Sequence, residues 1–462
     1  MSKLYIFGIG GTGSRVLKSL TMLLTSGVDC GVDTIVPIII DPDDAAADLT
    51  RTVESIKKYN SIRANLDCSN ATQNGFFRTE IREAVSNFRL PLHNTRDVKF
   101  KDYMSTSTMS MSNKAMMHIL FSQKNLESDM KVGFKGNPNI GSVVLNQFTD
   151  SYEFKSFAND FQQGDKIFII SSIFGGTGAS GFPLLAKTLR SNKAMPNHDL
   201  INHAQIGAIT VLPYFNLKQD DNSSIDSGTF ISKTKSALSY YHDNISNNNT
   251  VNALYYIADT IRNSYDNCEG GAGQKNNAHF IELVSALSII NFSFVDYNGG
   301  STTHLEFGLS RDSQQVIFED FGSETQKLLQ APLSQFILFS KYLRERNEMR
   351  KWRIERKFDQ AFFQSQFIKD IKVIQNDFMT WLEEMDDNQR RFSPYELSQT
   401  DKIFDIVKGK KPKRLMKLSS NYDLFDDFLN GQKVNNAASK EHQFIELFFN
   451  ATDELVKQKI NF

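Results

Sequence analysis

The hydrophobic positions in the N-terminal part of the chain fall into short, continuous apolar runs. They include LYIF (4–7), TIVPIII (34–40), IFII (167–170), QIGAITVLPYF (205–215) and NALYYIAD (252–259). Unbroken apolar runs of this length are typical of strands buried on both faces of a parallel sheet. Helix-like segments separate them, so we predict an α/β fold with a mostly parallel, Rossmann-like sheet and helices on both faces.

Other parts of the chain show helical spacing. Residues 50–130 are predicted to be mainly helical, with MSTSTMSMSN interpreted as a solvated loop and helix start. An almost wholly apolar segment over 276–294 is typical of a helix buried between layers or domains. From about 325 onward helical spacing dominates. The predicted organisation is a first domain over 1–275 with a helical insertion at about 50–130, a central helix at 276–294, and a mainly helical C-terminal region over 295–462.

Composition and charge narrow the class of protein. The 462 residues carry a formal net charge of −1, so we expect no nucleic-acid partner, and the basic run KGKKPKR is interpreted as a solvated loop. No apolar run approaches the roughly 20 residues of a membrane span, and no signal peptide is recognised. Cys30, Cys68 and Cys268 match no metal spacing. These features predict a cytoplasmic protein without a membrane span.

Two glycine-rich segments each follow a predicted strand and precede a predicted helix. One runs from Gly8 to Gly13 and the other, GGTGASG, from Gly175 to Gly181. Glycine lets backbone N–H groups approach an anion, and the helix N-terminus adds partial positive charge. Either loop alone could equally be a tight turn that needs glycine at positive φ. Together they predict one nucleotide held from two sides.

Acidic residues follow the second predicted strand, where α/β folds place ligands. Asp41, together with the G-x-G-x-x-G spacing that starts at Gly8, fits the dinucleotide fingerprint and keeps an NAD-dependent Rossmann enzyme as an alternative. Asp43 or Asp44 could meet Mg²⁺ bound to a phosphate, or could cap the next helix.

The loops, taken in order, resemble those of the tubulin/FtsZ superfamily. The central FGGTGASG is similar to the tubulin signature GGGTGSG, with Phe174 in place of the first glycine and Ala179-Ser180 where the family has Ser-Gly. GIGGTGSRVL resembles the first nucleotide loop, IIIDPDDAAADL the second, and KGNPNIG the third, which lies near the γ-phosphate. ITVLPYF is similar to the strand that follows the signature, and 276–294 stands where the family's central helix does. The chain looks most similar to divergent bacterial tubulin-like proteins.

This resemblance implies a cytoskeletal protein that binds GTP or GDP with Mg²⁺ and self-associates as an oligomer or filament, with the C-terminal helical region available to a protein partner. Asp43 would act on Mg²⁺ through phosphate or water, and Asn276 or Asn277 would meet the guanine base. The implied nucleotide-binding residues are Gly10, Gly11, Thr12, Gly13, Asp41, Gly136, Asn137, Gly175, Gly176, Thr177, Gly178, Ala179, Ser180, Gly181, Asn276 and Asn277.

Two departures from the family pattern limit the expected activity. The segment between the second and third loops is longer than in FtsZ, and the acidic NxDxxD-type loop after the central helix is missing. Asp296, Glu306 and, more weakly, Glu282 are the candidate catalytic acids. We therefore expect a slow GTPase or a GTP-dependent switch coupled to assembly or partner binding, with a non-hydrolysing nucleotide-sensing scaffold as the alternative.

Overall fold

A computed structural model describes most of the chain. The described residues are 2–68, 75–95, 97–130, 133–134, 136–218, 230–260, 263–265, 271–273, 275–297, 299–307, 309, 314–346, 350–398, 402–411, 421–434 and 439–460. Cys268 and the last three residues of the basic run, 412–414, lie outside these ranges.

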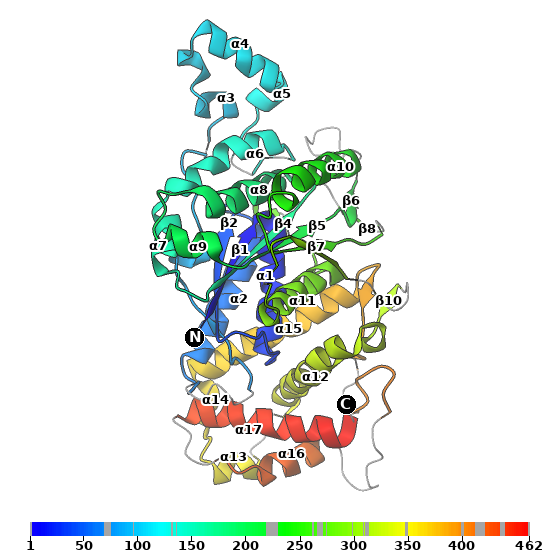
Figure 1. Ribbon diagram of the computed structural model, residues 1–462. Helices are drawn as coiled ribbons and strands as arrows, with labels where there is room; N and C mark the ends of the chain where they lie inside the picture. The colour runs from blue at the N-terminus through cyan, green and yellow to red at the C-terminus, as the bar shows by residue number, and fades with distance from the viewer. Residues whose placement is uncertain are drawn as a thin grey trace.

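A seven-stranded parallel sheet forms the centre of the molecule (Figure 1), in the order β3-β2-β1-β4-β5-β7-β9. The strands are β1 (Lys3–Ile9), β2 (Thr34–Ile40), β3 (Glu80–Ile81), β4 (Lys166–Ser172), β5 (Ile206–Val211), β7 (Ala253–Ile257) and β9 (Thr303–Glu306). Strands β1, β2 and β5 are buried along their whole length. Their unbroken apolar runs therefore follow from burial on both faces.

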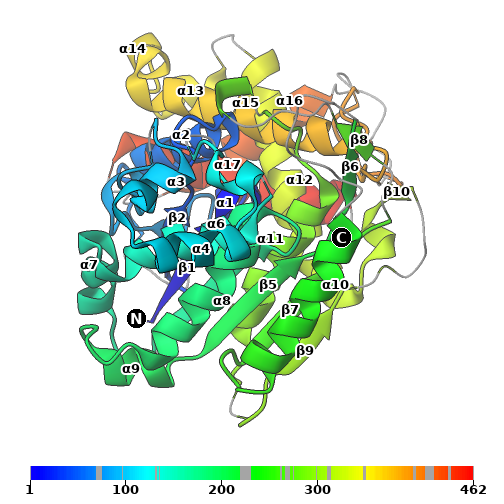
Figure 2. The same cartoon turned by 90° about the horizontal axis from the view of Figure 1, so that it is seen from above.

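Helices cover both faces of this sheet, as the sequence predicted. One face carries α1 (Gly10–Thr25), α2 (Ala47–Arg63) and α11 (Phe280–Phe294), and the other carries α6 (Pro138–Leu145), α8 (Gly176–Ser191) and α10 (Phe230–Tyr241). Seen from above, α6 and α8 lie over the sheet and β5, β7 and β9 run side by side (Figure 2). The central helix begins at Phe280, so the predicted span 276–294 includes four residues that precede it.

The strand order reverses between β1 and β4. From β1 the chain moves to β2 and β3, and from β4 it moves the other way to β5, β7 and β9. Right-handed crossovers therefore place α1 and α8 on opposite faces. The carboxyl ends of β1 and β4 flank the crevice where open α/β sheets bind ligands.

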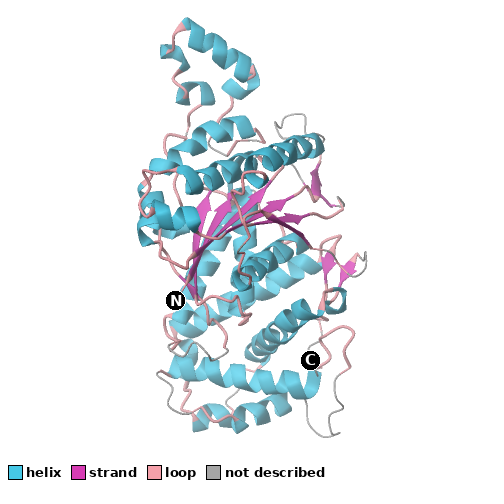
Figure 3. Cartoon of the chain, in the orientation of Figure 1, coloured by secondary structure: helices cyan, strands magenta, loops and turns pink. Residues whose placement is uncertain are grey.

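The C-terminal region is largely helical and forms further layers beyond α1, α2 and α11 (Figure 3). Its helices are α12 (Ser323–Glu345), α13 (Lys351–Glu355), α14 (Gln360–Gln364), α15 (Gln366–Asp386), α16 (Asn421–Gly431) and α17 (Lys440–Leu455). Aromatic contacts join these layers: Phe339 lies 4.6 Å from Phe448 between ring centroids and stacks on Phe76 at 5.5 Å. The α/β fold class with a helical C-terminal region is thus confirmed.

Two smaller features complete the fold. Short parallel pairs form between β6 (Phe215–Leu217) and β8 (Asn263–Tyr265), and between β10 (Gln315–Val316) and β11 (Arg391–Phe392). The insertion carries α3 (Phe100–Tyr103), α4 (Met111–Leu120) and α5 (Gln123–Leu126), which form a projecting lobe at the top of Figure 1. None of the helices in the described ranges combines the length and the apolar character that crossing a lipid bilayer requires.

Candidate functional site

The predicted loops meet at the crevice between β1 and β4. A Cβ built on Gly10 would lie 3.4 Å from the Thr177 Cβ, which brings the first loop against the central one. A Cβ on Gly176 would lie 3.1 Å from the backbone nitrogens of both Gly136 and Asn137, which brings in the third loop. A Cβ on Gly133 would lie 3.8 Å from Pro42 in the second loop. Four segments far apart in sequence therefore converge on one point.

Three helices begin at this point. They are α1 at Gly10, α8 at Gly176 and α6 at Pro138, with Gly10 and Gly136 at positive φ of 70° and 73°. The N-cap residues of α1 and α8, Ile9 and Gly175, supply no side-chain hydrogen bond to the helix. The first N–H groups of both helices thus lack a side-chain acceptor, and their partial positive charges add. The geometry suits a bound anion such as phosphate.

The glycines of the two loops have different roles. A Cβ added to Gly13 would lie 2.3 Å from the Gly8 backbone. A Cβ added to Gly178 would lie 2.6 Å from the Ser172 carbonyl oxygen, and one added to Gly181 would lie 2.9 Å from the Ile9 side chain. These three positions are required by packing between strand and helix. Gly11 is exposed, and a Cβ added to it would have no atom within 4 Å, so Gly11 faces open space at the crevice.

Other residues of the central loop turn inward. The Ser180 hydroxyl donates to the Gly176 carbonyl at 2.7 Å, and the Ala179 carbonyl accepts from the Tyr241 hydroxyl at 3.1 Å. Thr12 and Thr177 are half-buried. The Ser180 side chain is therefore engaged within the helix, and the backbone N–H groups at the start of α8 are the groups best suited to meet an anion.

Of the acids after β2, Asp41 and Asp43 are buried in a turn and Asp44 is exposed. Asp41 Oδ1 accepts a hydrogen bond from the Asp43 N–H at 3.0 Å, and burial raises the pKa of the Asp41 carboxyl to about 7. Asp43 accepts from the backbone N–H groups of Ala45, at 3.1 Å, and Gly271, at 2.6 Å. Asp44 pairs with Arg89. Each acid thus has a structural partner, and among the described residues no group of three or more His, Cys, Asp or Glu is arranged to hold a metal ion.

The asparagines expected to meet the base lie just before α11. The Asn276 side-chain amide donates to Asp48 Oδ2 at 3.3 Å, and the Asn276 backbone carbonyl accepts from Arg51 Nη2 at 2.6 Å. Asn277 is exposed. Asn276 therefore sits at the rim of a charged network, while the Asn277 side chain remains open to solvent.

A buried ion network beneath this rim was missed at the sequence level. Arg15 on α1 lies 2.8 Å from Glu282 on α11 and 3.7 Å from Asp48 on α2, and donates to the Tyr214 hydroxyl at 2.6 Å. The neighbouring Tyr214, Glu282 and Asp48 raise the pKa of the Arg15 guanidinium, while burial opposes them. No spacing in the sequence links these residues, which lie up to 267 positions apart. A second missed cation is Lys233, whose ammonium donates to the Gly136 carbonyl at 3.0 Å.

The three candidate catalytic acids lie in different environments. Glu282 is 2% exposed, pairs with Arg15 and, with His279, forms the capping box of α11; burial raises its pKa to about 7. Glu306 ends β9, at the same end of the sheet as the loops, and lines a cavity of about 710 Å³. Asp296 follows α11, is exposed, and lies 3.0 Å from Lys166 at the amino end of β4. The structure thus places Glu306 and Asp296 at opposite ends of the sheet.

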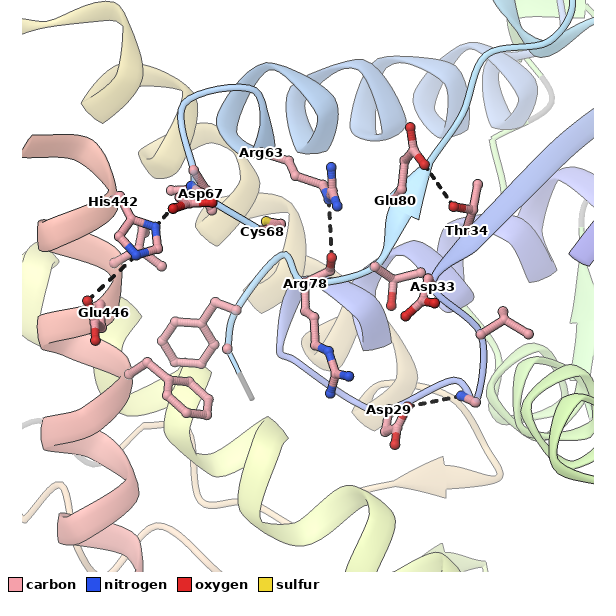
Figure 4. A pocket seen from close by; sticks show the side chains of 18 of the residues that line it. Asp29, Asp33, Thr34, Arg63, Asp67, Cys68, Arg78, Glu80, His442 and Glu446 are labelled. Carbon is pink, nitrogen blue, oxygen red and sulfur yellow. Dashed lines mark hydrogen bonds and ion pairs between the residues drawn. The ribbon is translucent and has the colours of Figure 1, made fainter. Parts of the chain in front are cut away.

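A second cavity, of about 480 Å³, lies at the amino end of β2 (Figure 4). Its polar groups bond to one another: the Asp67 N–H donates to His442 Nδ1 at 3.1 Å, and the Thr34 hydroxyl donates to Glu80 at 2.7 Å. The cavity is where the end of α2 meets α17. Its contacts join the C-terminal region to the sheet.

Comparisons with known proteins give structural matches only. No family model matches the chain, and no curated protein matches its sequence. The structure is similar to an empty FtsZ dimer from M. jannaschii, with 14% identity over 65% of this chain and 56% of that one, and a TM-score of 0.30. It is also similar to CetZ from Methanosaeta thermophila strain DSM 6194, with 15% identity over 63% of this chain and 51% of that one, and a TM-score of 0.29.

A further match is a GTPgS-bound protofilament of CetZ2 from Haloferax volcanii, with 15% identity over 64% of this chain and 60% of that one, and a TM-score of 0.32. This chain therefore matches roughly half to three fifths of the length of these structures. FtsZ is among the solved structures to which it is similar, as the loop motifs predicted. Because the TM-scores are low, the proposals below rest on the chain's own loops.

Proposed function

We propose that the chain binds a guanine nucleotide with Mg²⁺ at the crevice between β1 and β4. The observation that carries the proposal is the convergence of the N-termini of α1, α8 and α6 on one point. Three helix dipoles and the N–H groups from Gly10 to Gly13 and from Gly175 to Gly178 would neutralise a phosphate chain. Lys233, on α10 and bonded to the Gly136 carbonyl of the third loop, would lie near the terminal phosphate.

The remaining residues complete the proposed site. Asn276 and Asn277 would meet the base beside α11. Asp43 would reach Mg²⁺ through a bound water, because both of its carboxylate oxygens already accept backbone hydrogen bonds. A magnesium ion held there would offset the charge of the phosphate oxygens.

The NAD-dependent alternative is less well supported. A dinucleotide enzyme needs an acid at the end of the second strand to accept hydrogen bonds from the ribose hydroxyls. Asp41 occupies that position, but it is 8% exposed and its Oδ1 is bonded to the Asp43 N–H. In a dinucleotide enzyme, the contact between the third and central loops at Gly176 would also have no role.

We further propose that the nucleotide controls self-association of a cytoplasmic protein and that hydrolysis is slow. Asp296 would be the acid that one subunit offers to the next, but it already pairs with Lys166. Glu282 is buried within its own subunit. These restraints favour a switch with slow turnover, and they keep a non-hydrolysing, nucleotide-sensing scaffold as the second candidate.

Calorimetry with GTP, GDP, ATP and NAD tests the binding proposal. We expect GTP and GDP to bind more tightly than ATP or NAD. Gly11→Val should weaken GTP binding by roughly 100-fold or more, because its side chain would occupy the open space at the start of α1. Gly431→Val is the matched control, since Gly431 ends α16 and also has nothing within 4 Å. Tight NAD binding without GTP binding would overturn the proposal.

A further inference from the structure

The projecting lobe formed by α3, α4 and α5 is the part of the insertion that the nucleotide site does not use. It extends beyond α6, on the side of the molecule opposite the C-terminal helices (Figures 1 and 3). Its tip is a preformed helix: the Ser110 hydroxyl caps α4 by accepting from the Asn113 N–H at 3.3 Å. The sequence predicted a solvated loop and helix start there, within a mainly helical segment.

Helix α4 presents its apolar side chains to solvent. Met117 is its only buried residue, whereas Met111, Met116, Ile119 and Leu120 are 88%, 56%, 79% and 58% exposed. Residues four apart share a helix face, so Met111 lies in line with Ile119 and Met116 in line with Leu120. The two rows are adjacent: Ile119 points away from Met117, whereas Leu120, three residues after Met117, borders the packed side. The exposed part of α4 therefore carries four large apolar side chains.

Charge is divided within the lobe. The acids between residues 97 and 130 are Asp97, Asp102, Glu127 and Asp129, at the two ends of this segment, where Glu127 pairs with Lys99 at 2.8 Å and with Lys101 at 2.6 Å. Residues 103–126, which include α4, contain Lys114, Lys124 and His118 and no acid. The tip thus combines exposed apolar side chains with net positive charge, while the acids lie at the two ends of the segment.

We propose that this tip binds the surface of an anionic lipid bilayer. Helix α4 would lie in the plane of the interface, with Met111, Met116, Ile119 and Leu120 among the acyl chains and Lys114 and Lys124 near lipid phosphates. A protein surface fits less well, because a ten-residue helix is only about 15 Å long, and its apolar face falls far short of the ~800 Å² per partner of a stable interface.

Co-sedimentation with vesicles tests this proposal, using the full chain. Equimolar phosphatidylglycerol and phosphatidylcholine vesicles should bind the protein, and vesicles of phosphatidylcholine alone should bind it much less. Ile119→Ser with Leu120→Ser should weaken binding at least roughly tenfold, because these side chains would no longer insert. Lys114→Gln with Lys124→Gln should weaken it and reduce its dependence on salt. The control is Ile354→Ser, at a 62% exposed position on α13.

The proposal is overturned if wild-type protein does not bind the anionic vesicles, or if the serine variant binds them as well as the control does. Analytical ultracentrifugation without lipid gives a second test. The proposal is also overturned if wild type self-associates with rising concentration and the same serine variant does not. That result would assign the face to a second copy of the chain. Circular dichroism of every variant establishes that the fold is retained, as expected for exposed positions.

Discussion

At the scale of single residues, His279 links the acid–base chemistry of the chain to its stability. Its Nδ1 accepts the Ile281 N–H at 3.0 Å as the N-cap of α11, and it is 3% exposed against Tyr214. Its pKa is lowered from 6.5 to about 4, chiefly by burial, with Asp259 opposing this shift and Arg15 and Arg390 adding to it. The cap therefore requires the neutral ring.

This predicts a pH-dependent loss of stability. Between pH 6.5 and 4 the unfolded chain binds a proton at His279 that the folded chain does not, so the free energy of unfolding falls as the pH is lowered through this window. Relative to pH 7.5, wild type should lose about 2 kcal/mol through this residue at pH 5. His279→Asn keeps a capping acceptor and should lose less. Urea unfolding at both pH values measures the difference, and equal losses would contradict the assignment.

At the scale of elements, the ion pair between Arg15 and Glu282 holds α1 against α11. Both side chains are largely buried, at 11% and 3% exposure, so each depends on the other for compensation of its charge. This contact couples the first glycine loop to the helix that begins beside Asn276. The loop geometry thus depends on helix packing as much as on glycine.

Removing one partner should therefore be costly. Arg15→Leu is expected to lower the free energy of unfolding by about 3–5 kcal/mol, because Glu282 would be left buried without a cation. The double variant Arg15→Leu/Glu282→Leu should recover part of the loss. Lys327→Ala, at an exposed pair with Glu324, is the control and should change little. Urea unfolding measures the free energy of unfolding of each variant. If Arg15→Leu lowers it no more than this control does, the pair is not a stabilising contact.

At the scale of the whole molecule, α11 connects the two ends of the sheet. It starts beside the proposed nucleotide site and runs 15 residues, about 22 Å, to Phe294. Asp296 therefore lies at the amino end of the sheet and Glu306 at the carboxyl end. In a head-to-tail stack of subunits, only the acid at the amino end would face the neighbouring nucleotide.

This arrangement predicts how GTP hydrolysis should depend on assembly. Turnover should be well below about 10 per second and should rise steeply with protein concentration. Asp296→Ala should lower it, while Glu306→Ala, at the other end, should not. The measurement is a dilution series of GTP hydrolysis with light scattering alongside. Turnover that is independent of concentration and unaffected by Asp296→Ala would show that the chain supplies its own catalytic group.

The sequence by itself determined the fold class and the positions of the glycine loops. Apolar runs such as those of β1 and β4 record burial on both faces, and glycine at Gly10 and Gly136 permits positive φ; both are local properties that a short stretch of residues displays. The order of the strands then places the loops together, because right-handed crossovers leave few alternatives.

Only the tertiary structure decided what individual side chains do. The sequence does not distinguish Gly11, which faces open space, from Gly178, which packs against Ser172; we therefore expect a side chain at Gly178 to disturb the turn itself. Nor does it show that Arg15 meets Glu282, or that α4 turns its apolar face outward. Close approach, charge pairing and solvent exposure depend on segments far apart in the chain, so no local pattern encodes them.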